Sequence, residues 1–166
     1  KQFGVTDILL NHADIPGANG RWELQDLVKL RLMVESHGLN LSALENVPTN
    51  FYDHVMLNGP KRDEQIENMI FTIRNIAKSG IPIFGYNWMP SQVWRTEPKL
   101  IRGDAVATAF DDSVAQKMPL THEREYTEEE MWGSLENWIK IITPIAEEEG
   151  IRLGIHPCDP PVPKLG

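Results

Sequence analysis

The sequence predicts an α/β fold with parallel strands, and three observations lead to this prediction. Four short segments share one pattern, in which a glycine precedes a β-branched or aliphatic run that stops at polar residues. Three intervening segments have the apolar spacing of amphipathic helices. Strands therefore alternate with helices along the chain, and this order favours parallel strands joined by right-handed crossovers.

The four expected strands cover residues 4–12, 38–46, 80–88 and 150–156. Each is short and rich in aliphatic residues, which favours a strand over a helix. Three of the leading glycines also close a helical segment, where glycine supplies the left-handed conformation of a helix end. The polar residues at the strand ends are Asn11 and His12, Glu45 and Asn46, Asn87, and His156.

The expected helices cover residues 23–37, 63–79 and 127–149. The second is the clearest, because the apolar residues from Ile66 to Ala77 follow the helical spacing closely. In the third, Thr127 and Glu130 have the spacing of a capping box, and the apolar stripe includes Ile139. Pro144 should bend this helix near its end.

The connections between these elements are unequal in length. Each helix passes into the next strand through little more than one glycine, whereas the loops after the strands cover residues 13–22, 47–62 and 89–126. In α/β folds the carboxyl ends of the strands carry the functional site. The long loops after the strands therefore predict that the functional site lies at the carboxyl ends of the strands.

The repeat length favours a (β/α)₈ TIM barrel. One strand and helix take about 40 residues, and eight repeats give about 330, within the usual range for such a barrel. Four strands make about half of a barrel, so we expect residues 1–166 to be a single-domain fragment. The alternative is a doubly wound sheet, but residues 11–16 lack its glycine-rich phosphate loop.

Composition excludes several classes of protein. The 166 residues carry 24 acidic and 16 basic side chains and a net charge of −8, which disfavours nucleic-acid binding and anionic membranes. No apolar run approaches the roughly 20 residues of a membrane span. The single cysteine, Cys158, excludes an intrachain disulfide and fits a reducing compartment, so we expect a cytoplasmic protein. Walker and serine-hydrolase motifs are absent.

His156 is the strongest candidate metal ligand. A histidine at a strand end can bind a metal through one nitrogen while an acceptor fixes the other, and the flanking prolines stiffen its backbone. The alternative is a histidine satisfied by a loop carbonyl. Cys158 and Asp159 are possible ligands or partners of His156.

The remaining candidates lie at two other strand ends and in the loop after the third strand, whose composition suits a sugar acid. Glu45 can hold a metal, act as a base or bind a sugar hydroxyl, unless it pairs with a loop arginine. Asn11 and His12 are weaker candidates, since both residue types are common in turns. The loop after the third strand combines Asn87, Trp88 and Arg95, which offer an amide, a flat apolar face and a forked donor for a carboxylate. Alternatively, the tryptophans there only pack the loop onto the sheet.

Several strings resemble the mannonate dehydratase family, and together they extend over nearly the whole chain. They are ENVP at 45–48, RDEQIEN at 62–68, TIRNI at 72–76, GYNWMP at 85–90, VWRT at 93–96 and IHPCDPP at 155–161. The last resembles the family's His-Pro-Asp-Asp-Pro-Pro segment, with Cys158 in place of an aspartate.

The resemblance implies a xylose-isomerase-like barrel that uses Mn²⁺ or Fe²⁺ to dehydrate D-mannonate to 2-dehydro-3-deoxy-D-gluconate in hexuronate (glucuronate) breakdown. It implies that His156 is a metal ligand and that the four strands are strands two to five. The other ligands, a cysteine, a histidine and an aspartate, and the acid/base residues belong to the family's C-terminal half. The catalytic residues are therefore unassigned here, and Cys158 is not expected to be the cysteine ligand.

The leading hypothesis is thus a metal-dependent lyase that acts on a small sugar acid and forms a homo-oligomer at full length. A sugar isomerase or epimerase on the same barrel is one alternative, and a noncatalytic carbohydrate-binding fragment is another. Residues 1–166 alone are expected to be inactive, because most of the implied metal ligands are missing.

Overall fold

A computed structural model describes residues 3–166 and contains a four-stranded parallel sheet. The strands are β1 (Asp7–His12), β2 (Asn40–Asn46), β3 (Ile83–Asn87) and β6 (Arg152–His156), in the order β1-β2-β3-β6. Every neighbouring pair is parallel, which confirms the four predicted strands. All four carboxyl ends therefore lie at the same edge of the sheet.

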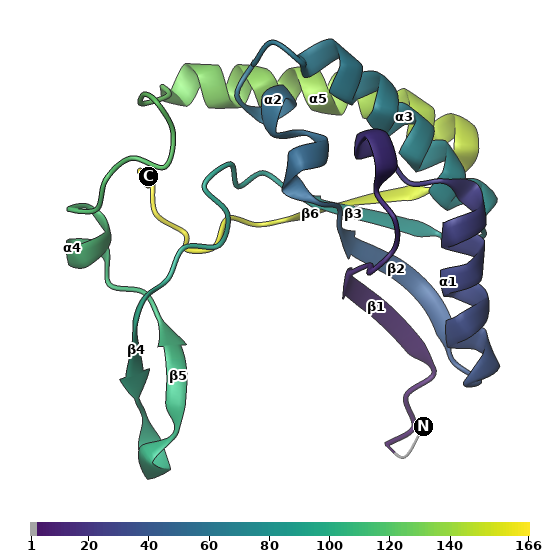
Figure 1. Cartoon of the computed structure of the whole chain (residues 1–166), viewed down its shortest axis with the longest axis horizontal. Coiled ribbons are helices and arrows are strands. Elements are labelled where there is room, and N and C mark those ends of the chain that lie inside the picture. Colours follow the sequence, from purple (N-terminus) through teal and green to yellow (C-terminus); the bar gives the residue numbers. More distant parts are fainter. Residues whose placement is uncertain (1–2) are drawn as a thin grey trace.

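Three long helices connect the strands and lie on one side of the sheet (Figure 1). They are α1 (Leu24–Ser36), α3 (Arg62–Lys78) and α5 (Glu128–Glu149), close to their predicted positions. α5 begins with the predicted capping box, in which Thr127 Oγ1 accepts from the Glu130 N–H and Glu130 accepts from the Thr127 N–H. It ends at Gly150, whose φ of 66° is left-handed.

The core fills the space between the sheet and these helices. Leu44 and Phe84 are register partners on β2 and β3, and both are fully buried. Ile73 of α3 and Trp138 of α5 are also fully buried in this core. Burial of each such side chain stabilises the fold by about 1.5–3 kcal/mol. Ile139 does not belong to the stripe as predicted, because it is 41% exposed.

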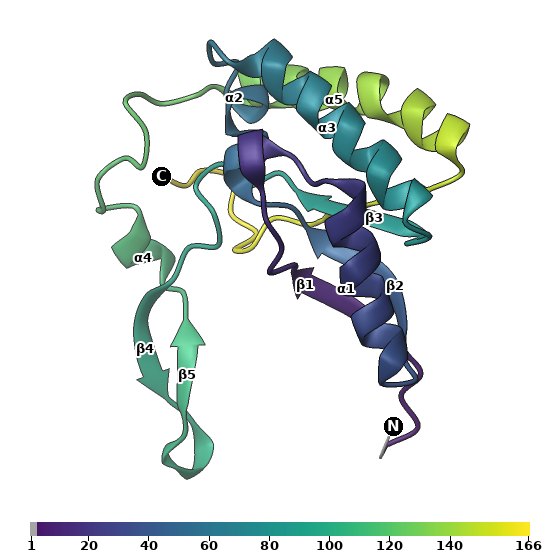
Figure 2. The same ribbon diagram turned by 45° about the vertical axis from the view of Figure 1, so that its right-hand side comes forward.

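The predicted loop over residues 89–126 contains a hairpin and a short helix that the sequence pattern does not predict. An antiparallel hairpin of β4 (Thr96–Leu100) and β5 (Val106–Ala109) projects away from the parallel sheet (Figures 1 and 2). Its turn contains the 3₁₀ helix η3 (Arg102–Asp104), and helix α4 (Asp112–Ala115) follows. The loop before α3 holds η2 (Thr49–Phe51) and α2 (Asp53–Met56), and η1 (Ala18–Gly20) precedes α1.

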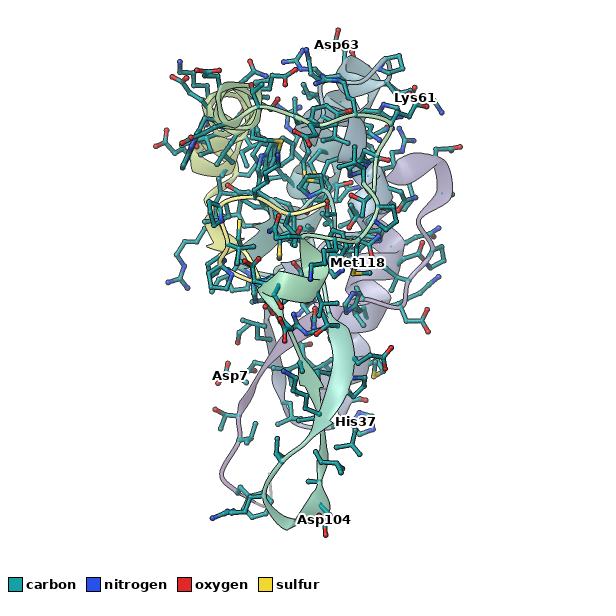
Figure 3. All side chains as sticks on the ribbon, turned by 90° about the vertical axis from the view of Figure 1, so that its left-hand side faces the viewer. Asp7, His37, Lys61, Asp63, Asp104 and Met118 are labelled. Carbon is teal, nitrogen blue, oxygen red and sulfur yellow. The ribbon has the colours of Figure 1, made fainter. Side chains whose placement is uncertain are left out.

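Figure 3 looks at the molecule from the side of the hairpin, whose tip is near Asp104. The helical layer with Lys61 and Asp63 lies at the opposite end of this view. Among the described residues, no helix is both long and apolar enough to span a bilayer.

Candidate functional site

A cavity of about 460 Å³ lies at the carboxyl ends of the strands. Its lining combines strand ends with the loops that follow β2, β3 and β6. Six of the seven predicted site residues line it: Asn11, His12, Glu45, Asn87, Arg95 and His156. The lining also includes Asn46 and Asp159. Parallel pairing brings the side chains at the strand ends together from distant parts of the sequence.

His156 presents one ring nitrogen to the cavity and anchors the other. Its Nδ1 atom lies 2.8 Å from the carbonyl oxygen of Pro157, and a carbonyl can only accept. Nδ1 therefore carries the hydrogen, and Nε2 has a free lone pair in the neutral ring. Nε2 lies 3.6 Å from Glu45 Oε1. A loop carbonyl thus satisfies one nitrogen, as in the alternative interpretation, while the other remains available for a ligand.

Arg95 forms a two-bonded ion pair with Asp159 across the cavity. Nη1 donates to Oδ1 over 3.0 Å and Nη2 to Oδ2 over 2.7 Å. The hydrogen bonds from the guanidinium hold the pKa of Asp159 below its ordinary value. Nη1 also donates to the Trp94 carbonyl, so two of the five N–H groups of Arg95 remain for a ligand.

Three asparagine side chains form a chain of hydrogen bonds across the strand ends. Asn87 Nδ2 donates to Asn46 Oδ1 over 3.0 Å, and Asn46 Nδ2 donates to Asn11 Oδ1 over 2.9 Å. The sequence alone predicts no role for Asn46, because this role depends on partners from two other strands. The one feature of the sequence that points to Asn46 is its position directly after Glu45, at the end of a strand.

Tyr52 fixes the backbone at Asn87. Its hydroxyl donates to the Asn87 carbonyl over 2.9 Å and accepts from the Asn87 N–H over 3.3 Å. The ring is fully buried and stacks on Trp138. Burial raises the pKa of Tyr52, so the hydroxyl keeps its proton. The end of β3 is thereby tied to the core.

Trp88 is the one predicted site residue that the structure places elsewhere. It is 7% exposed, and its ring packs near Tyr52 and Trp138 in the core. The reason is strand alternation, because Phe84 and Tyr86 on β3 also face the helices and Trp88 continues that face. Trp88 therefore belongs to the hydrophobic core under the site and does not line the cavity.

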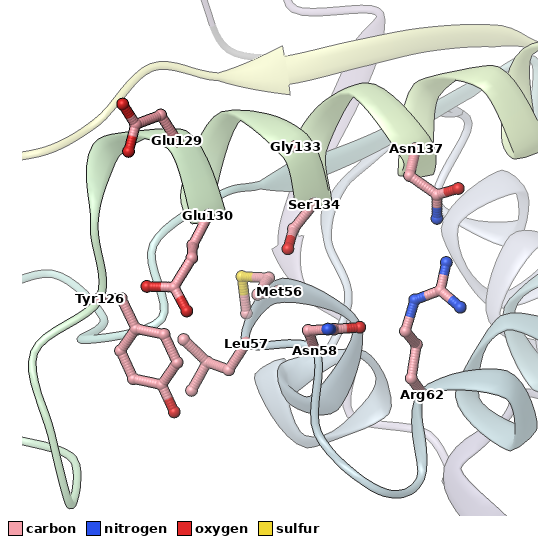
Figure 4. Close-up of a pocket in the computed structure, with 10 residues that line it drawn as sticks. All are labelled: Met56, Leu57, Asn58, Arg62, Tyr126, Glu129, Glu130, Gly133, Ser134 and Asn137. Atoms are coloured by element: carbon pink, nitrogen blue, oxygen red, sulfur yellow. The ribbon is translucent and has the colours of Figure 1, made fainter.

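A second cavity of about 250 Å³ lies between α5 and the loop that joins α2 to α3 (Figure 4). Arg62, Ser134 and Asn137 are among its polar residues. The Glu130 carboxylate in its wall is already paired with Arg124 and with the Thr127 N–H. No strand end contributes to its lining, so it lacks the residues predicted for chemistry.

Comparison with known proteins identifies the family. The model of the family described as D-mannonate dehydratase (UxuA) matches residues 1–123 and 107–166. This chain belongs to that family. Mannonate dehydratase from Streptococcus pneumoniae (strain 70585) is 30% identical over 187 residues, which cover 95% of this chain and 50% of that protein. Mannonate dehydratase from Streptococcus uberis is 36% identical over 170 residues, which cover 87% and 48%.

A solved member of the D-mannonate dehydratase family has the same fold. The crystal structure of mannonate dehydratase from Streptococcus suis serotype 2 matches with a TM-score of 0.81 and 34% identity. The match covers 94% of this chain and 46% of that chain. The chain thus spans about half the length of the curated relatives it matches.

Mannonate dehydratases generally need a divalent metal ion. Within residues 3–166, no cluster of three or more His, Cys, Asp or Glu side chains is placed to hold one. The His156 imidazole and the Glu45 carboxylate are the two donors that approach one another in the cavity. Cys158 is exposed and does not belong to the cavity lining. The described residues therefore fit part of a metal site.

Proposed function

We propose that the protein containing this chain is a metal-dependent D-mannonate dehydratase, which converts D-mannonate to 2-dehydro-3-deoxy-D-gluconate and water in hexuronate breakdown. Family membership supports the reaction. The observation that carries the proposal is the position of the His156 Nε2 atom, which has no backbone partner within residues 3–166 and lies 3.6 Å from Glu45 Oε1 at the carboxyl ends of the strands.

The chain is, in this proposal, about half of a (β/α)₈ barrel and supplies strands two to five. The parallel sheet with helices on one side supports this fold. The outer strands β1 and β6 each have one neighbour in the sheet, so each leaves backbone groups for a further strand. The second half would supply the remaining metal ligands and the acid/base residues. At full length the protein would form a homo-oligomer.

The charges in the cavity favour a cation together with an anionic ligand. Its lining contains the carboxylates of Glu45 and Asp159 and the single guanidinium of Arg95. A sugar acid adds another negative charge, which a divalent cation would offset. His156 would hold this ion, Mn²⁺ or Fe²⁺, with Glu45 beside it. When bound, the ion stabilises negative charge on substrate oxygens as a Lewis acid.

The other lining residues would bind and orient the sugar acid. Asn11, His12, Glu45 and Asn87 offer donors and acceptors for hydroxyl groups. Arg95 offers its two remaining N–H groups to an oxygen of the ligand. Such positioning lowers the barrier by holding the C2 hydrogen and the C3 hydroxyl of the substrate in a reactive arrangement.

Product identification tests this proposal. The complete gene product is incubated with Mn²⁺ and D-mannonate, and the products are identified by NMR. We expect 2-dehydro-3-deoxy-D-gluconate, formed only when the metal is supplied. A product that retains all the oxygen atoms of mannonate would identify an isomerase or epimerase instead. Binding of mannonate without any conversion would identify a noncatalytic protein and overturn the proposal.

A further inference from the structure

The chain of asparagine side chains has a direction, and a backbone group sets it. The Met89 N–H donates to Asn87 Oδ1 over 3.3 Å. A backbone N–H can only donate, so the oxygen of the Asn87 amide must face Met89 and its NH₂ group must face Asn46. The reverse orientation would place two donors against each other and leave both unsatisfied.

The direction set at Asn87 passes through Asn46 to Asn11. Because Asn46 accepts from Asn87 with Oδ1, its NH₂ group faces Asn11 and donates to Asn11 Oδ1. The Asn11 oxygen is therefore occupied. Within residues 3–166, the Asn11 NH₂ group has no hydrogen-bond partner, and Asn11 lines the cavity.

We propose that Asn46 is a positioning residue that turns the side-chain amide of Asn11 so that its NH₂ group faces the cavity as a hydrogen-bond donor. The inference rests on the proposed function, because the ligand that this donor serves is the sugar acid. Asn11 would donate to a hydroxyl or carboxylate oxygen of that ligand. Asn46 contributes to ligand selection through Asn11 and not through its own contact.

The Asn46→Asp substitution distinguishes an effect of Asn46 through Asn11 from a direct contact of Asn46 with the ligand. A carboxylate at position 46 still accepts from Asn87, but it has no hydrogen to donate to Asn11. The Asn11 amide then gains by rotating, since its NH₂ group can donate to the carboxylate. The Asn11 oxygen now faces the cavity, and the donor for the ligand is lost.

Hydrogen exchange of side-chain amides tests the orientation without any ligand. In the complete gene product labelled with ¹⁵N-asparagine, we expect slow exchange with water for the NH₂ groups of Asn46 and Asn87 and fast exchange for Asn11. In the Asn46→Asp variant, the Asn11 NH₂ group should become protected. Protection of Asn11 before the substitution, or no gain in protection after it, would overturn the inference.

Binding of D-mannonate, measured by calorimetry, tests the consequence for the ligand. Loss of one hydrogen bond should weaken binding about tenfold in Asn46→Asp. Because the substitution also adds a charge, it is repeated in an Asn11→Ala background, where the further loss should be less than about twofold. Asn19→Asp, outside the cavity lining, adds the same charge and should leave binding unchanged.

Two further outcomes are informative. An equal tenfold loss in the Asn11→Ala background would show that Asn46 acts through its own charge or contact, which contradicts the inference. In the second outcome, the Asn11 NH₂ group gains protection in Asn46→Asp, but D-mannonate does not bind the unsubstituted protein. The proposed function then fails, while the inferred orientation of the Asn11 amide stands. Asn46→Ala provides a second variant if the aspartate variant does not fold, and its effect on binding should also require Asn11.

Discussion

The Nε2 atom of His156 lies 3.6 Å from the Oε1 atom of Glu45, although the strands that carry them, β6 and β2, are not neighbours. Strand β3 lies between them and pairs with both, Phe84 with Leu44 of β2 and Asn87 with His156 of β6. Gly85 has no side chain, and Asn87 directs its amide toward Asn46. The contact between the imidazole and the carboxylate therefore depends on β3 as much as on its own two strands.

The close approach of β2 and β3 makes Gly85 sensitive to any side chain. A Cβ atom at this position would overlap the carbonyl oxygen of Glu45. We expect Gly85→Ala to lower the free energy of unfolding by about 1–3 kcal/mol, because the strands must separate. Denaturant unfolding of the complete gene product measures this change.

The same substitution at Gly133 is the matched control. Gly133 lies within α5, and a Cβ atom there would meet nothing within 4 Å. Gly133→Ala should raise the free energy of unfolding by about 0.5–1 kcal/mol, because alanine favours a helix interior. Equal effects of the two substitutions would contradict the close packing inferred at Gly85.

Residues 1–166 alone should not dehydrate D-mannonate. Within residues 3–166 no cluster of three ligand side chains exists, and two donors do not provide the several-ligand geometry that metal catalysis needs. The purified chain is assayed with Mn²⁺ and D-mannonate for the keto-deoxy product. Metal-dependent turnover close to that of the complete protein would show that the catalytic residues lie within this half.

The capping box at α5 should remain ionised in moderately acidic solution. Hydrogen bonds lower the pKa of Glu130 from 4.5 to about 2. The largest contribution comes from Arg124, and the next largest comes from the Thr127 N–H. A lowered pKa in the folded state means that Glu130 stabilises the fold above pH 4.5 and loses this contribution as the pH falls toward 2.

Carboxyl NMR titration checks this prediction directly. In Arg124→Ala the pKa of Glu130 should rise toward its ordinary value, because the largest cause of the shift is removed. Arg102→Ala removes a guanidinium in the β4–β5 turn and should leave the titration of Glu130 unchanged. Titration of Glu130 near pH 4.5 in the unsubstituted protein would refute the ion pair.

Local patterns were sufficient to predict the parallel sheet and the long helices. The capping box of Thr127 and Glu130 and the glycines at the helix ends are encoded within a few residues. The β4–β5 hairpin was missed because the segment at 96–100 contains Glu97, Pro98 and Lys99, which break the strand pattern. Its strands are defined by pairing with each other rather than by their own composition.

The sequence placed candidate residues correctly in the cavity where the strand end itself identified the residue. Glu45 and His156 needed only the rule that parallel strands end at one edge. The aromatic composition of its loop suggests a ligand site for Trp88, but the alternation of β3 directs this side chain to the core. Tyr52 has no local signal, since its role is a hydrogen bond to Asn87 from a different loop.

The metal content of a His156→Ala variant shows whether His156 is a metal ligand. The complete gene product and the variant are loaded with Mn²⁺, dialysed, and compared by elemental analysis and by turnover of D-mannonate. Cys158→Ser, an exposed neighbour outside the cavity lining, is the control and should match the unsubstituted protein. We predict that His156→Ala loses most of its bound manganese and that its rate falls by more than about 100-fold. Substitution of a residue that only hydrogen-bonds to a metal ligand typically costs about 10- to 100-fold, and removal of the ligand itself should cost more. Full manganese content with an unchanged rate would contradict the assignment and give His156 a structural role.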